Sequence, residues 1–71
     1  MGMRIRVDLE SDALYFRLSE DPVENSREVA SGFILDFNKD GAVIGFEVLG
    51  IKGRFPLEDL SHLKVEMQTV A

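Results

Sequence analysis

The residues best spaced for metal chemistry are the oxygen-bearing side chains Asp36, Asn38 and Asp40, followed by Gly41 and Glu47. Their order matches the calcium loop of EF-hands. That loop needs oxygen ligands at alternating positions, a glycine at the sharp turn and a carboxylate at its end. A motif of this kind predicts calcium binding only if the flanking elements agree with it, so the flanks decide how it is interpreted.

The flanking residues favour strands, whereas an EF-hand loop joins two helices. Phe33–Phe37 and Ala42–Leu49 alternate with the period of two that is typical of a strand. On a strand, Glu47 would lie about 20 Å along the chain from Gly41, too far to close around the same ion. We therefore expect a hairpin turn here. A cation-binding protein using the Asp36–Asp40 turn remains an alternative.

Two further groups could in principle carry chemistry. Asp8, Glu10 and Asp12 would point to one side of an extended chain, but such clusters are typical of solvated turns. His62 is the only histidine, and a single imidazole without cysteine cannot build a zinc site. We expect it at the end of a helix, where an imidazole interacts favourably with the helix dipole.

Paired carboxylates are the remaining candidate for catalysis. Alternation places Asp36 and Glu47 on one face of neighbouring strands, and two such groups can perform acid–base work. A catalytic pair also needs a pocket, and a meander of this size offers little room for one. We therefore predict that the chain is not an enzyme and uses no cofactor, and an enzyme built on this pair is the weakest alternative.

The elements that position these residues begin with two predicted hairpins. Arg4–Glu10 and Ala13–Ser19 each place three apolar side chains on one face, with a short polar turn between them. In the second hairpin, Phe33–Phe37 pairs with Ala42–Leu49 across a turn at Asn38–Gly41. Matching the apolar rows of these two strands predicts, for example, Leu35 opposite Phe46.

The rest of the chain gives weaker signals. We predict a loop over Glu20–Ser26 and a short strand or an extended lead-in over Arg27–Ala30. A loop or bulge over Gly50–Gly53, a helix over Pro56–His62 and a last strand over Leu63–Met67 should follow. The predicted fold is α+β and mainly β. It is a small antiparallel β-meander of four to five strands with one short helix near the C-terminus, in a single domain over residues 1–71.

Composition excludes several classes of partner. Of the 71 residues, 13 are Asp or Glu and 8 are Lys or Arg, so the net charge of −5 disfavours nucleic acid and anionic membrane surfaces. The chain has no cysteine and no long apolar run, and we expect a cytoplasmic protein. Apolar residues make up 45 %, whereas a domain this short buries only about 60 % of its unfolded surface. Surplus apolar surface indicates a partner or self-association.

Two separated segments resemble a known family. Asp8–Leu18, with its Asp-Ala-Leu-Tyr sequence, and Gly32–Gly41 resemble the opening strand and the hairpin of small prokaryotic proteins catalogued as domain of unknown function 2283. Val23–Val29 and Val43–Leu49 resemble the middle segment and the closing strand, whereas the tail from Arg54 is not covered. The resemblance implies a compact, mostly antiparallel fold. It also implies an antitoxin-like role as a possible alternative, because some members are thought to lie beside small toxin-like proteins.

The leading hypothesis for function is a non-enzymatic protein-interaction module, forming a homodimer or binding a small protein partner. Exposed strand edges and surplus apolar surface motivate this hypothesis. Tyr15 is expected to point away from the apolar row of its strand, and tyrosine is enriched at interfaces. The predicted interaction surface is made of Tyr15, Ile34, Val43 and Leu49.

Overall fold

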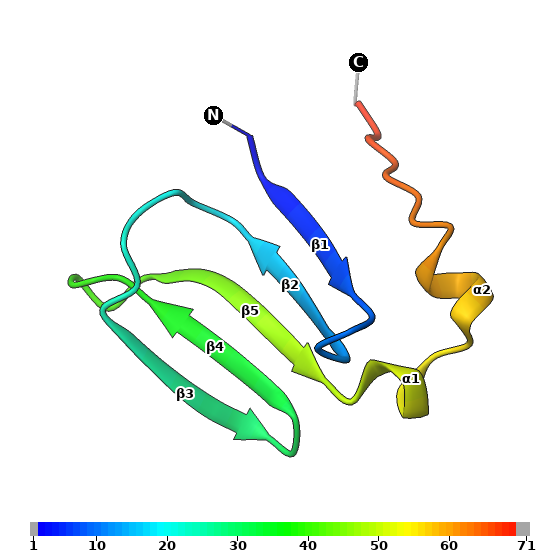
Figure 1. Cartoon of the computed structure of the whole chain (residues 1–71). Coiled ribbons are helices and arrows are strands. Elements are labelled where there is room, and N and C mark those ends of the chain that lie inside the picture. Colours follow the sequence, from blue (N-terminus) through cyan, green and yellow to red (C-terminus); the bar gives the residue numbers. More distant parts are fainter. Residues whose placement is uncertain (1, 70–71) are drawn as a thin grey trace.

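Five strands and two short helices make up the fold in the computed structural model, which describes residues 2–69 (Figure 1). The strands are β1 (Arg4–Asp8), β2 (Ala13–Arg17), β3 (Asn25–Ala30), β4 (Phe33–Phe37) and β5 (Val43–Leu49). The predicted class, mainly β within α+β, is therefore confirmed, as is an antiparallel sheet of five strands.

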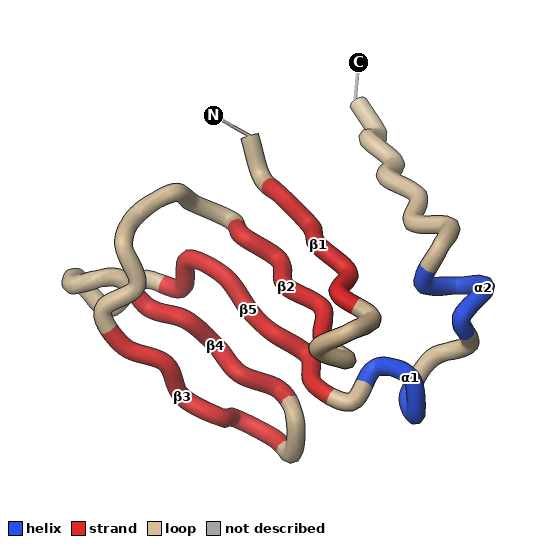
Figure 2. Tube along the Cα trace, viewed as in Figure 1, coloured by secondary structure: helices blue, strands red, loops and turns tan. Residues whose placement is uncertain are grey.

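All five strands form one sheet in the order β1-β2-β5-β4-β3, and every neighbouring pair is antiparallel. Strand β5 lies at the centre, between the two hairpins, and β1 and β3 form the edges (Figure 2). Leu35 pairs with Phe46 as the apolar rows predict. The register shifts between Asp36 and Phe37, so Phe37 pairs with Val43 and Ile44 is the extra residue of a β-bulge.

Polar side chains stabilise the β1–β2 turn and the β4–β5 turn. Asp8 accepts hydrogen bonds from the backbone N–H and the hydroxyl of Ser11, each at 3.1 Å, which closes the β1–β2 turn. Asn38 Oδ1 accepts the backbone N–H groups of Asp40 and Ala42 at 3.0 and 2.9 Å in the β4–β5 turn. These are the local hydrogen bonds that make Asp and Asn favourable in turns.

The helices differ from the sequence prediction. Helix α1 (Ile51–Arg54) occupies the segment predicted as a loop or bulge, and α2 (Leu57–Leu60) is shorter than the predicted Pro56–His62. A side chain distant in sequence caps α1, because Asp12 Oδ1 accepts the backbone N–H of Lys52 at 2.8 Å. That contact is made across 40 residues, so the local pattern of residues 50–53 could not reveal it.

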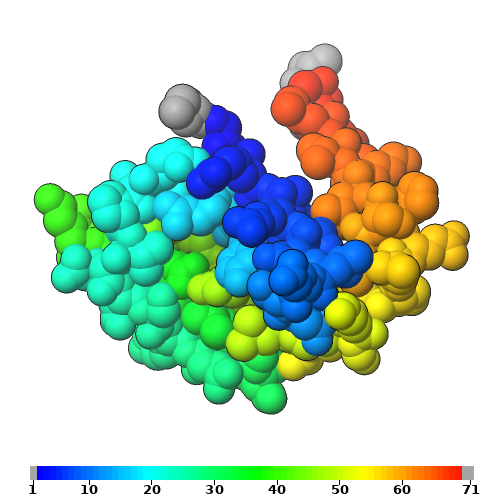
Figure 3. Space-filling model, in the orientation of Figure 1, coloured from blue at the N-terminus to red at the C-terminus, as the bar shows by residue number. Residues whose placement is uncertain are grey.

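The tail also differs from the prediction. Residues 63–69 form no strand, so the predicted last strand over Leu63–Met67 is wrong for the single chain. Val65 and Met67 are 90 % and 86 % exposed. Figure 3 shows the tail projecting as an arm from the body of the molecule. A strand needs a neighbour for its backbone hydrogen bonds, and the tail leaves α2 rather than the plane of the sheet.

A small core joins the helices to one face of the sheet. Ile51 of α1 and Leu60 of α2 are 0 % and 7 % exposed, and they pack with Val48. Val7, Leu14 and Phe46 complete this cluster. Among residues 2–69, the helices therefore form a second layer over one end of the sheet. No helix within residues 2–69 is long and apolar enough to cross a membrane.

Arg54 locks this second layer to the far hairpin. Its Nε donates to the backbone oxygen of Leu49 at 2.8 Å, and its Nη2 donates to that of Ser31 at 2.7 Å. The guanidinium also lies 4.8 Å from the ring centre of Phe33. A Cβ atom on Gly32 would collide with this guanidinium, and Gly32 has a φ of 78°, so the β3–β4 turn requires glycine.

Candidate functional site

Strand register divides the side chains of the sheet between two faces, because directly paired residues point to the same side. We name one side the apolar face, and it carries two rows of directly paired residues. The covered row consists of Val7, Leu14, Val48 and Phe33. The first three pack with Ile51 and Leu60 of the helices, and the guanidinium of Arg54 lies over the ring of Phe33. The open row is the next along the strands and consists of Ile5, Phe16, Phe46 and Leu35.

Within residues 2–69, the core under the helices reaches the open row only at Phe46. Ile5 is 42 % exposed, and the other three side chains are half-buried although they lie in the middle of the sheet. The rings of Phe16 and Phe46 stack with centroids 5.4 Å apart and planes inclined by 16°. Exposed Leu18 follows on β2, and the guanidinium of Arg27 lies 5.0 Å from the ring centre of Phe37. The four apolar side chains of the open row are directly paired neighbours across β1, β2, β5 and β4.

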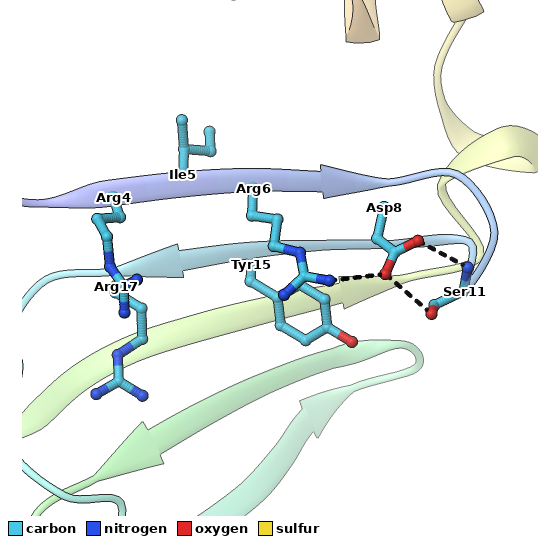
Figure 4. Close-up of a pocket in the computed structure, with 7 residues that line it drawn as sticks. All are labelled: Arg4, Ile5, Arg6, Asp8, Ser11, Tyr15 and Arg17. Atoms are coloured by element: carbon cyan, nitrogen blue, oxygen red, sulfur yellow. Dashed lines mark hydrogen bonds and ion pairs between the residues drawn. The ribbon is translucent and has the colours of Figure 1, made fainter.

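The opposite side of the sheet, which we name the polar face, is dominated by charges at its β1–β2 end. Figure 4 shows Arg4, Arg6, Tyr15 and Arg17 on this side, whereas Ile5 points the other way. These side chains line a shallow pocket together with Asp8 and Ser11. Acidic groups already pair with two of its cations. Arg4 meets Glu20 at 3.1 Å, and Arg6 meets Asp8 at 3.3 Å.

A carboxyl pair lies further across the polar face. Asp36 is buried, with 6 % exposed, and it accepts the hydroxyl of Ser26 at 2.6 Å. Glu47 lies diagonally from it on β5, because Asp36 pairs with Gly45. Burial raises the pKa of Glu47, and the negative charge of Asp36 and a hydrogen bond between the two carboxyl groups raise it further. The predicted arrangement of this pair on one face is therefore present in the structure.

The predicted interaction residues come only partly together. Tyr15 and Ile34 flank Glu47 in one row of the polar face, and Leu49 lies on β5 two residues beyond it. Val43 stands beside the bulge and is 43 % exposed. The interaction surface predicted from the sequence did not include the open row of the apolar face. The signal that could have revealed this row is the small number of apolar side chains available to cover the sheet. Among the described residues, α1 and α2 place only Ile51 and Leu60 in the core.

The segment resembling a calcium loop behaves as a hairpin turn. Asn38 Oδ1 already accepts two backbone N–H groups, its Nδ2 donates to Asp21 at 3.1 Å, and Asp36 is held by Ser26. Within the described part of the chain, no group of three or more His, Asp or Glu side chains is arranged to hold a metal ion. Cation binding at this turn stays a prediction from sequence.

The other acidic and histidine candidates have structural partners. The two hydrogen bonds from Ser11 hold the pKa of Asp8 below its ordinary value. Asp12 caps α1. His62 follows α2, with its Nδ1 2.9 Å from the backbone oxygen of Glu58. Each of these three side chains therefore has a contact within the fold that accounts for its position.

The fold and its two faces define a class, a single-layer antiparallel sheet with helices over one end. Residues 4–52 match the model of the family described as "Protein of unknown function (DUF2283)", so the chain belongs to that family. The match confirms the resemblance seen in the sequence, ends at Lys52 and excludes Arg54. No curated protein and no solved structure matches the chain.

Proposed function

We propose that this chain is a non-enzymatic interaction module that associates with a second copy of itself through the open row of its apolar face. The observation that carries the proposal is the exposure of this row at the centre of the sheet. A one-layer sheet hides one face only if something covers it, and here the residues of the two helices pack on one end of that face and reach the open row at Phe46. A second copy of the same surface supplies the missing layer.

Surface area supports this reading. A monomeric protein of 8.0 kDa exposes about 4,450 Å² on average. This chain exposes 5666 Å², about 1,200 Å² more than that average. A typical stable interface removes about 800 Å² from each partner. The surplus area is therefore larger than the area that one partner buries in a typical interface, and the exposed tail contributes to the remainder.

We place the interface on the apolar face rather than on the predicted Tyr15 surface, because the charges differ. Tyr15 and Ile34 flank Glu47, and arginines surround Tyr15, so packing against that side would desolvate several charges. The open row presents aliphatic and aromatic side chains, and these are the groups that fill the cores of interfaces. Face-to-face packing of two such sheets is the arrangement of a β-sandwich.

We further propose that the chain acts in the cytoplasm and uses no cofactor. Its net charge of −5 also disfavours nucleic acid as a partner. A small unrelated protein, such as a toxin-like neighbour, would use the same apolar surface.

The test is the mass of the purified chain, measured by sedimentation equilibrium over a hundredfold range of concentration. We expect twice the chain mass at the upper concentrations. A single species at the mass of one chain throughout would refute the proposal.

A further inference from the structure

The second unpartnered feature of the molecule is the outer edge of β1. Strand β1 pairs only with β2, so its other edge has no neighbouring strand within residues 2–69. Ile5 and Val7 belong to the apolar face, and Arg6 and Asp8 belong to the polar face. An open edge of this kind is a template for one more strand.

The tail has the matching pattern. Leu63, Val65 and Met67 are 48 %, 90 % and 86 % exposed, and they alternate with Lys64 and Glu66. Strand geometry would put the three apolar side chains on one side and the two charges on the other. In the single chain Lys64 pairs with Glu66 at 3.5 Å, and within residues 2–69 neither charge forms an ion pair outside the tail.

One register brings these two segments into agreement at every position. In an antiparallel pair with Lys64 opposite Asp8, Glu66 falls opposite Arg6, and both charge pairs are attractive. The apolar residues then meet across the strands as Leu63 with Leu9, Val65 with Val7, and Met67 with Ile5. Cross-strand neighbours of this kind, apolar with apolar and positive with negative, stabilise a sheet.

Other registers fail on charge. A shift by two residues sets Lys64 against Arg6 in one direction and Glu66 against Asp8 in the other. A shift by one residue exchanges the faces and sets charges against apolar side chains. Parallel registers that set Lys64 and Glu66 opposite charged residues of Arg4–Glu10 each contain at least one pair of like charges, and the remaining parallel registers set both charges opposite apolar side chains.

From this we infer that Leu63–Met67 of one copy adds to β1 of a second copy as an antiparallel strand in that register. The inference rests on the proposed self-association and names a second contact within it. Leu60 packs on the apolar face, so the tail leaves α2 in the layer above its own sheet. In the proposed dimer that layer holds the sheet of the partner. Figure 1 shows the tail running back toward the end of the molecule where β1 begins, antiparallel to the β1 of its own chain, so pairing within one chain is the outcome that the test must separate from exchange.

A charge-exchange experiment tests the inference and separates exchange between copies from pairing within one chain. Glu66→Arg puts arginine opposite Arg6, and Arg6→Glu puts glutamate opposite Glu66. Each variant alone should dimerise about tenfold more weakly than the wild type, since two contacts per dimer become repulsive. An equimolar mixture should regain wild-type affinity, because both contacts are attractive again in the mixed dimer. Asp8 is left unchanged, so its hydrogen bonds to Ser11 persist.

The matched control is Glu24→Arg, the same charge change at an exposed residue of the β2–β3 loop. Its dimer affinity should stay within twofold of the wild type. A wild-type dimer whose affinity neither variant alters, or a mixture no tighter than its components, would overturn the tail exchange and leave self-association standing. A wild type that stays monomeric would instead remove the proposed function and the exchange together.

Discussion

Phe16 and Phe46 stack at 5.4 Å between ring centres on the central strands of the sheet, yet neither ring is buried. In the proposed dimer both rings lie in the interface. Replacing Phe16 by Thr keeps a residue that suits a strand but removes the ring. Central aromatic residues often contribute 2 kcal/mol or more to an interface, and a symmetric dimer contains two copies. We expect the dissociation constant to rise at least about a hundredfold, measured by sedimentation equilibrium.

Tyr15→Thr is the matched control for that variant, because it removes an aromatic ring from the neighbouring residue on the opposite face. Its dissociation constant should stay close to that of the wild type. The reverse ranking of the two variants would move the interface to the polar face, as predicted from Tyr15 in the sequence. Far-ultraviolet circular dichroism checks that both variants keep their sheet.

Asp12 holds the β1–β2 turn against α1 and has a left-handed φ of 56°. Asp12→Ala removes the oxygen that accepts the N–H of Lys52, and it places alanine in a backbone region that disfavours it. We expect a loss of about 1–2 kcal/mol in the free energy of unfolding. Asp12→Asn retains an oxygen and tolerates the same φ, so it should lose less than half as much. Urea unfolding at fixed protein concentration measures both, and equal losses would contradict the capping role.

Arg54 joins α1 to the carbonyl groups of Leu49 and Ser31 through two separate nitrogens. Lysine keeps the charge but cannot donate from a planar fork, so Arg54→Lys tests geometry rather than charge. We expect Arg54→Lys to lower the free energy of unfolding by about 1–2 kcal/mol. Lys52→Arg, the reverse exchange on the same helix, should change it by less than about 0.5 kcal/mol. An Arg54→Lys variant as stable as the wild type would show that the two hydrogen bonds contribute little to the free energy of unfolding.

Glu47 predicts a pH dependence of stability. Its pKa is raised above the ordinary 4.5, so above pH 4.5 the folded chain keeps a proton that the unfolded chain releases. The free energy of unfolding should therefore fall as pH rises from 4.5 through the folded pKa. Asp8 has a lowered pKa, and its contribution is lost only as pH falls below the ordinary 3.8, which is a separate window.

Glu47→Gln removes the titrating group and the repulsion from Asp36. We expect the free energy of unfolding of this variant to be independent of pH over that range. At pH 7 it should exceed that of the wild type by about 0.2–1 kcal/mol. Urea unfolding at several values between pH 4 and pH 8 measures the difference. Glu24→Gln is the exposed control and should follow the wild type. A wild-type curve that rises across the window would contradict the raised pKa.

Alternation predicted most of the sheet. The rows of Phe33–Phe37 and Ala42–Leu49 could be matched from parity alone, and Leu35 does pair with Phe46. The same parity placed Asp36 and Glu47 on one face. These features depend on a local period, and for that reason they are readable in a single sequence.

Features that depend on distant contacts could not be predicted in this way. Helix α1 is capped by Asp12 and tied by Arg54 to the β3–β4 turn, and neither contact leaves a local signal in Ile51–Arg54. The tail has the alternation of a strand, but none of the strands in the described part of the chain pairs with it. The open row was recognisable as apolar, whereas its lack of cover depends on how few side chains α1 and α2 bring to it.

Sedimentation equilibrium of the wild-type chain against concentration tests the central claim most directly. The account predicts a reversible monomer–dimer equilibrium whose upper limit is twice the 8.0 kDa chain mass. A single species of one chain mass at every concentration would contradict it, because the open row of Ile5, Phe16, Phe46 and Leu35 would then face water without a partner.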